Sequence, residues 1–417
     1  RPLPEDAAFL GELSLSGALR PVTGVLPMAL TAARLGIRQL FVPAHNAAEA
    51  TLADGVEVYA VENVAQLLAH LSGQAAMTPQ PRWEPGRESR PLPDFADVMG
   101  QENVKRALEV AAAGGHNLIM VGPPGSGKSM MAKRLPSILP PLTLSESLET
   151  TQIHSIAGKL AKNVSLIAQR PFRAPHHTIS QVALVGGGTS PQPGEISLAH
   201  NGVLFCDELP EFNKTTLEVL RQPLEDRHIN ISRAKYTIDY PCSFMFVASM
   251  NPCPCGYYGD PTHRCVCTPG QIQRYMNKIS GPLLDRIDIQ CEISPVPFKD
   301  ISKAAPGEPS AKIRERVIRA REIQAERFKD FKGIHCNAQM TERMIHQFAE
   351  PTEEGINLLR MAMEKLSLSA RAYNRILKVA RTIADLAGSQ QIEPQHLAEA
   401  IGYRTLDRGD WAERGHL

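Results

Sequence analysis

The eight residues from Gly122 to Ser129 constrain the fold of this 417-residue chain more than any other segment. They read Gly-Pro-Pro-Gly-Ser-Gly-Lys-Ser and match the phosphate-loop pattern G-x-x-x-x-G-K-[ST] at every fixed position. The largely apolar run 116–121 predicts a buried strand before the loop, and residues 130–135 predict a helix after it. A strand, a glycine-rich turn and a helix in this order are typical of an α/β fold that binds nucleotide at its strand tips.

This loop predicts a site for a nucleoside triphosphate and Mg²⁺. Its glycines allow consecutive backbone N–H groups to turn inward around a polyphosphate. Lys128 can reach the β- and γ-phosphates, and the Ser129 hydroxyl suits a Mg²⁺ ligand. The predicted nucleotide-binding residues are Gly122, Pro123, Pro124, Gly125, Ser126, Gly127, Lys128 and Ser129.

Polar residues follow two further apolar runs. The run 202–206 ends in Asp207 and Glu208, which are suited to holding Mg²⁺ through water and to polarising the attacking water, respectively. The run 243–250 leads to Asn251, whose amide can orient that water between Glu208 and the γ-phosphate. The alternative for Asn251 is that Asn251-Pro252 simply starts a turn.

The overall composition is that of a globular protein without a general attraction for nucleic acid. The chain has 45 Lys and Arg against 44 Asp and Glu, so any contact with nucleic acid must come from a local patch. No apolar run reaches the ~18 residues of a membrane span, and no signal segment is present. We expect a soluble, cytoplasmic protein. The start at Arg1 suggests a piece that lacks its own N-terminus.

Changes in composition and periodicity predict four segments. Residues 1–78 form a small α/β unit, and residues 79–94 are a linker rich in Pro, Arg and Glu. In residues 95–300 strands alternate with helices, which favours a mostly parallel sheet covered on both faces. Residues 301–417 are helical. The clearest expected elements are strands at 9–15 and 39–42, and helices at 28–35, 64–72, 311–331, 353–365 and 370–387.

Four of the eight cysteines stand alone and four cluster. The isolated ones are expected mainly as small buried hydrophobes: Cys206, Cys242, Cys291 and Cys336. The others follow a C-x-C-x₉-C-x-C pattern that suits a structural Zn²⁺ held by Cys253, Cys255, Cys265 and Cys267. Two disulfides or an iron–sulfur cluster are the alternatives, and His263 could replace one ligand.

Residues 227–241 predict a β-hairpin. Alternation in 228–231 and 236–240 suits two strands, and the tip between them carries Arg233 and Lys235. These cations could contact a phosphate backbone, or they could form an ordinary solvated turn. A second insertion, residues 172–195, contains three consecutive glycines and two adjacent histidines.

With these motifs in hand, the chain resembles AAA+ ATPases of the branch that contains magnesium chelatase and MCM helicases. Within that branch it is similar to the ComM family over essentially its whole length. The resemblance implies a AAA+ P-loop core, a C-terminal helical lid and a Lon-protease-like N-terminal domain that lacks its first part. The segments that carry it are residues 122–129, 173–178, 193–202, 207–208, 251–256 and 281–288.

The resemblance also implies further site residues. Arg286 matches the family's arginine finger, which reaches the nucleotide of a neighbouring subunit and so implies a ring, most often a hexamer. The alternative is an ion pair with Asp285 or Asp288. Arg371, at the start of a lid helix, matches the second sensor arginine. The hairpin with Arg233 and Lys235 is similar to the pore hairpin of MCM-type rings, which implies contact with single-stranded or branched DNA.

The expected function is therefore an ATP-driven hexameric DNA helicase that promotes branch migration during natural transformation. One rival is a chelatase-type motor that remodels a metal-inserting enzyme. The other is a Lon-like peptidase. Leu26 stands where that family's catalytic lysine would align, and the serine partner is absent, so we expect the N-terminal domain to be non-catalytic.

Overall fold

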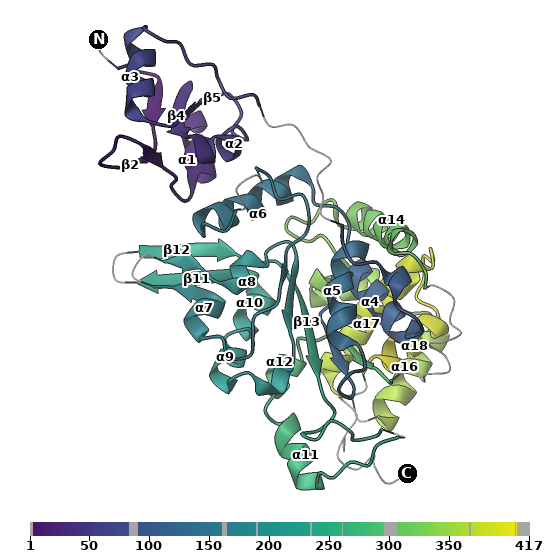
Figure 1. Cartoon of the computed structure of the whole chain (residues 1–417). Coiled ribbons are helices and arrows are strands. Elements are labelled where there is room, and N and C mark those ends of the chain that lie inside the picture. The colour runs from purple at the N-terminus through teal and green to yellow at the C-terminus, as the bar shows by residue number, and fades with distance from the viewer. Residues whose placement is uncertain are drawn as a thin grey trace.

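We describe the protein from a computed structural model. It covers residues 3–82, 91–160, 165–188, 191–233, 236–260, 262–295, 307–366, 368–404 and 406. A small N-terminal α/β unit, a larger α/β core and a C-terminal group of helices follow one another along the chain (Figure 1). Across the described ranges, no helix is both long and apolar enough to span a bilayer.

The N-terminal unit is a three-stranded parallel sheet in the order β1-β4-β5. Helices α1 and α2 pack on one face, against Leu40 and Val58, and α3 packs on the other, against Phe41. The predicted strand at 9–15 is instead two strands in two sheets, because the chain turns at Gly11, whose φ is +151°. The bounds are β1 Ala7–Phe9, β2 Glu12–Leu13, β3 Leu19–Arg20, α1 Val25–Arg34, β4 Gln39–Pro43, α2 Ala47–Ala50, β5 Glu57–Val61 and α3 Val64–Ser72.

A five-stranded parallel sheet, in the order β14-β6-β13-β10-β7, forms the centre of the core. Strands β6, β10 and β13 are buried at every position, as expected for a sheet covered on both faces. Alternate side chains divide the core into two layers: Leu118 and Met120 face one, and Ile119 and Val121 face the other. The strands are β6 Leu118–Val121, β7 Phe172–Arg173, β10 Val203–Cys206, β13 Met245–Met250 and β14 Ile289–Glu292.

Long helices cover the first face and short elements cover the second. The helices α4, α5, α14 and α17 pack over the first face, and the hairpin β11–β12 adds Ile229 and Ile231 to the second. The helices of the core are α4 Glu102–Gly114, α5 Lys128–Ile138, α6 Leu144–Ile156, α7 Gln181–Val185, α8 Glu195–Leu198, α9 Lys214–Glu218, α10 Arg221–Asp226, α11 Pro269–Met276 and α12 Gly281–Leu284.

Two hairpins occupy the insertions of the core. The first is a short ribbon of β8 (Gly186–Gly187) and β9 (Gln192–Pro193). The second pairs β11 (His228–Arg233) with β12 (Tyr236–Pro241) and projects from the core (Figure 1). Its strands reach farther than expected, since the backbone of Arg233 pairs with that of Tyr236. Lys235 and the side chain of Arg233 lie outside the described part of the structure.

The C-terminal region confirms the expected helices. Residues 353–365 are helical as predicted, the helix predicted at 370–387 ends one residue earlier, and the one at 311–331 starts at 310 and ends at 328. Helices α14 and α17 pack directly on the core. The bounds are α14 Ser310–Phe328, α15 Glu342–Phe348, α16 Glu353–Lys365, α17 Ala370–Leu386 and α18 Pro394–Gly402.

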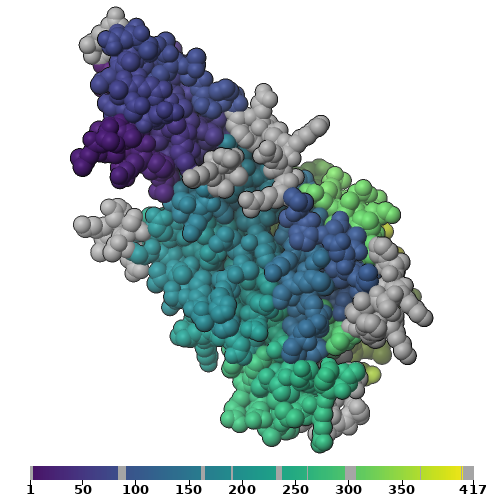
Figure 2. Space-filling model, viewed as in Figure 1, coloured from purple at the N-terminus to yellow at the C-terminus, as the bar shows by residue number. Residues whose placement is uncertain are grey.

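The N-terminal unit rests on helix α6 of the core. Figure 2 shows the two parts in contact. At this contact the buried carboxylate of Glu49 accepts a hydrogen bond from the Ser155 hydroxyl at 2.6 Å and others from Asn46 and the backbone N–H of Leu26. Leu26 itself is fully buried. Leu26 stands where the Lon protease family has its catalytic lysine, and an apolar, buried side chain cannot act as a base.

Candidate nucleotide site and four-cysteine cluster

The phosphate loop connects β6 to α5 at the carboxyl end of the sheet, as the pattern predicts. Gly125 and Gly127 have φ values of +76° and +91°, a region that favours glycine. The loop therefore curls back before the helix begins at Lys128. The first backbone amides of this helix have no intrahelical partner, which suits them to binding a polyphosphate.

The Lys128 amine forms hydrogen bonds with the backbone of the phosphate loop itself. Its Nζ donates to the backbone oxygens of Gly122 at 2.6 Å and Pro123 at 2.8 Å, and to Asn251 Oδ1 at 3.2 Å. Burial lowers the pKa of this amine, while the nearby charges of Asp207 and Glu208 act in the opposite direction. A buried cation bound only by neutral oxygens fits a site that receives an anion.

The two oxygens expected to hold Mg²⁺ meet beside the loop. Ser129 Oγ lies 2.5 Å from Asp207 Oδ2 at the tip of β10, so the hydroxyl and the carboxylate already converge. The other Asp207 oxygen accepts from the hydroxyl of Ser249 on β13. A hydroxyl and a carboxylate in this arrangement are ligands that Mg²⁺ prefers. The residues present therefore fit the metal that the loop implies.

Glu208 follows in a left-handed conformation, with φ of +52°, which is uncommon for a residue with a side chain. Its backbone N–H is bound by Asp207 and by Ser249. Its carboxylate is more than half exposed and lies 3.7 Å from His177 Nδ1. The Glu208 carboxylate thus lies at the surface and takes no part in the contact between Asp207 and Ser129.

The two expected arginines lie at the other end of the sheet. Asn117, at the amino end of β6, donates to the backbone oxygen of Arg286 at 2.8 Å. The five residue steps from Asn117 to Gly122 span about 17 Å at the usual strand rise. An arginine side chain anchored there does not reach the phosphate loop of its own subunit. The guanidinium of Arg286 instead bonds Glu225 and the Pro282 carbonyl, so the alternative of a pair with Asp285 or Asp288 is wrong.

Arg371, at the start of α17, lies on the same side as Arg286. It pairs with Asp285 at 2.6 Å, next to Arg286 in the chain, and its side chain is 74% exposed. Arg375, one turn later, pairs with the buried Asp288. The Asp288 carboxylate also faces Nδ1 of the buried His116, at the base of β6. Buried polar contacts therefore connect α17, the arginine-bearing segment and the start of strand β6.

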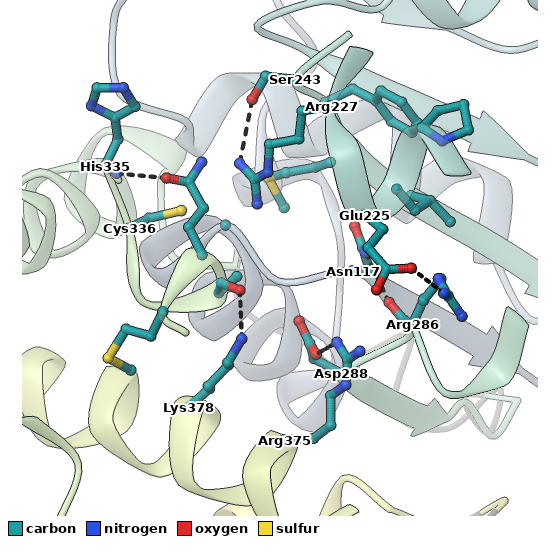
Figure 3. A pocket seen from close by; sticks show the side chains of 18 of the residues that line it. Asn117, Glu225, Arg227, Ser243, Arg286, Asp288, His335, Cys336, Arg375 and Lys378 are labelled. Carbon is teal, nitrogen blue, oxygen red and sulfur yellow. Dashed lines mark hydrogen bonds and ion pairs between the residues drawn. The ribbon is translucent and has the colours of Figure 1, made fainter. Parts of the chain in front are cut away.

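A cleft of about 710 Å³ opens beside these arginines. Figure 3 shows Arg286 with Glu225, and Asp288 with Arg375, on one side of it, and Arg227, His335 and Lys378 on the others. Burial lowers the pKa of the Lys378 amine to about 8, against the attraction of Asp288. The cleft thus presents several cations at the edge of the sheet opposite the phosphate loop.

The four clustered cysteines come together at the carboxyl end of the sheet. The Sγ atom of Cys253 lies 3.3 Å from that of Cys255 and 3.7 Å from that of Cys265, and all four sulfurs are within 4.8 Å of one another. Tetrahedral zinc–sulfur bonds of ~2.3 Å would separate the sulfurs by ~3.8 Å. All eight cysteines are free thiols, and the four isolated ones are buried as expected. The donor set and its spacing fit one tetrahedral metal ion.

His263 is not part of this cluster. Its ring stacks on Tyr257 with 4.8 Å between centroids, and its Nδ1 lies 2.9 Å from the Thr262 hydroxyl. Backbone N–H groups of Cys255 and Cys267 instead point at cluster sulfurs, each at 3.4 Å. The sulfurs thus complete a four-ligand set without the imidazole.

Sequence reasoning missed Ser249 and Glu225. Ser249 is a single hydroxyl within the apolar run of β13, at a position that the strand register places beside Asp207, and that isolated polar residue was the available signal. Glu225 lies 61 residues before Arg286 in an ordinary charged helix. No local pattern identifies it as the partner of that guanidinium.

Comparisons with known proteins agree with this architecture. The family model "Magnesium chelatase, subunit ChlI" matches residues 94–301, its C-terminal counterpart matches residues 307–404, and "Subunit ChlI of Mg-chelatase" matches residues 1–46. The chain is also 30% identical over 168 residues to Lon protease 2 of Bacillus subtilis, a match that covers 37% of this chain and 29% of that protein.

Several relatives match over nearly the whole chain. Competence protein ComM of Haemophilus influenzae is 46% identical over 407 residues, covering 96% of this chain and 78% of that protein. The uncharacterized protein YifB of Escherichia coli is 45% identical over 408 residues, covering 97% and 78%. With this identity, the matching chelatase models and the phosphate-loop core, the chain belongs to the ComM family of magnesium-chelatase-like AAA+ ATPases.

Proposed function

We propose that this protein is a ring-forming motor that hydrolyses ATP at sites shared between neighbouring subunits. The observation that carries the proposal is the placement of the site residues at opposite ends of one sheet. The phosphate loop, Asp207 and Asn251 lie at the carboxyl end, while Arg286 and Arg371 lie at the amino end. A head-to-tail contact between subunits brings one end of each sheet to the other end of the next.

Within the site, this chain's residues have separate roles. Lys128 and the loop amides bind the phosphates, and Ser129 with Asp207 would hold the Mg²⁺ that offsets charge on the β- and γ-oxygens. Glu208 takes the attacking water as its hydrogen-bond partner, and Asn251 orients it. Arg286 and Arg371 of the neighbouring subunit would stabilise the charge on the transferred phosphoryl group. We propose that the ring is a hexamer.

We propose DNA as the substrate of the motor, single-stranded or branched, and branch migration during natural transformation as its role. The name of the H. influenzae relative connects that protein with competence. The projecting β11–β12 hairpin supports the proposal, because the sequence that joins its two strands carries Arg233 and Lys235. Cations at the end of a hairpin suit phosphate contacts without base specificity. Such a motor would work in the cytoplasm.

Stimulation of ATP hydrolysis by forked DNA tests this role. We expect strong stimulation in the natural protein and its loss in the double variant Arg233→Ala, Lys235→Ala. The salt slope of DNA binding should fall by about 0.7 to 0.9 for each phosphate that the variant no longer neutralises. Lys332→Ala with Arg343→Ala, two exposed cations of the helical region, makes the same change in charge and serves as the control. An ATPase rate indifferent to DNA would remove the DNA hypothesis.

A chelatase-type motor is the second candidate, because the matching family models carry the magnesium chelatase description. In that case ATP hydrolysis would respond to a partner enzyme that inserts Mg²⁺ into a porphyrin and not to DNA. The DNA-stimulation assay separates the two candidates. A Lon-like peptidase is disfavoured, since the buried Leu26 offers no base.

We also propose that the four-cysteine cluster holds a structural Zn²⁺. Four sulfurs with tetrahedral spacing are the donor set that zinc prefers. Metal analysis of protein purified under reducing conditions should give about one equivalent per chain. Cys265→Ser with Cys267→Ser should lose it, and a content well below half an equivalent in the natural protein would exclude the proposal.

A further inference from the structure

The cysteine cluster is built into the nucleotide site. Asn251, which bonds the Lys128 amine at 3.2 Å, is followed two residues later by Cys253, the one fully buried ligand of the cluster. The chain then passes through the other three cysteines into α11. There the hydroxyl oxygen of Tyr275 accepts a hydrogen bond from the backbone N–H of Asn251. The segment 251–275 is therefore a closed loop whose two ends meet at a residue of the nucleotide site.

The middle of this loop touches the phosphate loop directly. Gly256, one residue after Cys255, lies against Pro124. A Cβ atom at Gly256 would come within 2.6 Å of Pro124 Cδ, closer than carbon atoms can approach. Gly256 also has φ of +89°. The cluster loop therefore packs on the phosphate loop with no room for a side chain between them.

These contacts give the cluster two independent routes to the bound nucleotide. One passes through Cys253 and Asn251 to the Lys128 amine, and the other through Gly256 to Pro124. In the described structure the four sulfurs are linked by weak N–H···S bonds and by sulfur–sulfur contacts of 3.3, 3.5 and 3.7 Å. A metal ion at their centre would fix both routes at once.

We propose that metal occupancy of the cysteine cluster and nucleotide binding at the phosphate loop are thermodynamically coupled. The metal-loaded cluster holds Asn251 and Pro124 in the nucleotide-binding arrangement, and loss of the metal loosens both. The coupling is necessarily reciprocal, so nucleotide must tighten metal binding by the same factor by which metal tightens nucleotide binding. This inference rests on the proposed Zn²⁺ and is independent of the ring and of DNA.

Zinc release at equilibrium provides the test. The natural protein is titrated with a chromogenic zinc chelator, with and without saturating ADP, and the apparent zinc affinity is read from the chelator's absorbance. We expect ADP to tighten zinc binding by at least about fivefold, the lower end of typical coupling factors. Lys128→Ala, which removes the phosphate-binding amine, controls for zinc taken up by ADP itself and should show no such shift.

Two matched glycine variants test whether the coupling passes through the contact between Gly256 and Pro124. Gly256→Ala and Gly259→Ala place the same methyl group at positive φ, at +89° and +77°, but only the first meets Pro124; nothing lies within 4 Å of the second. We expect Gly256→Ala to bind a full equivalent of zinc and to lose the part of the ADP effect that passes through Pro124, and Gly259→Ala to keep the whole effect. Pro124→Ala, which removes the ring from the other side of the contact, should reduce the ADP effect without changing zinc content.

The outcomes are distinct. Zinc affinity that is the same with and without ADP, in protein that binds both, overturns the coupling. An equal loss in Gly256→Ala and Gly259→Ala refutes the Pro124 contact as its route. Protein that never holds zinc refutes the metal assignment and the coupling with it. None of these results depends on whether DNA stimulates ATP hydrolysis.

Discussion

The phosphate loop and Arg286 lie at opposite ends of the same sheet. We therefore predict that two inactive variants, one changed at each end, restore each other's activity when mixed. Lys128→Ala removes the phosphate-binding amine at one end of the sheet, and Arg286→Ala removes the guanidinium at the other. The ends are about 17 Å apart along β6. Each variant alone should lose ATP hydrolysis, and Arg286→Ala should lose about a thousandfold, the lower end for an arginine finger.

Mixing the two variants should restore activity. Wherever an Arg286→Ala subunit, with its intact phosphate loop, meets the Arg286 edge of a Lys128→Ala subunit, a complete site forms. In an equal mixture this holds for about a quarter of head-to-tail interfaces. We therefore expect up to about a quarter of the natural rate of phosphate release, far above the sum of the two variants.

The control mixes Lys128→Ala with the double variant Lys128→Ala, Arg286→Ala. No interface in that mixture joins an intact loop to an intact arginine, so its rate should stay at background. Because Arg286 must leave Glu225 to reach a neighbour, the rate also depends on that pair. The pair is partly exposed, with Glu225 66% accessible, so its loss costs under about 1 kcal/mol. Mixtures that never exceed the separate variants would refute the shared site.

Three further outcomes follow from individual residues. Glu208→Gln should keep ATP binding, measured with a fluorescent nucleotide, and lose hydrolysis; retained turnover would contradict its role. Glu225→Gln should free Arg286 and raise ATP hydrolysis by at most about fivefold, the factor that corresponds to ~1 kcal/mol; a large decrease would show that the pair is needed in the active ring. Burial lowers the pKa of His116 below the ~6.5 of an unfolded histidine, so its stabilising effect is complete above that pH and is lost as the pH falls. The melting temperature should fall as the pH drops below about 6.5, and it should fall less in His116→Gln.

The local elements of this fold were predictable because their signals are local. The phosphate loop, the helix at 353–365 and the burial of the isolated cysteines follow from short patterns. The prediction of a single strand at 9–15 was wrong, because the backbone turns at Gly11 with a positive φ. An alternation of apolar and polar residues does not reveal such a turn.

The relation between site residues was harder to predict because it depends on tertiary contacts. The family resemblance suggested Arg286 and Arg371 as site residues but not the end of the sheet on which they lie, since that depends on the strand order β14-β6-β13. Partners distant in sequence, such as Glu225, and the contact of Gly256 with Pro124 leave no periodic signal. The four cysteines are the exception, because their paired spacing predicted their convergence.

The placement of the phosphate loop and the two arginines at opposite ends of the sheet has a consequence for subunits that are not in the proposed ring. An open row of n subunits joined head to tail contains n − 1 complete sites, and a single subunit contains none. A newly made or dissociated chain would thus bind ATP without consuming it. Closure of the ring would complete the last site, so hydrolysis would require contact between subunits and would reach its full rate per subunit only in the closed ring.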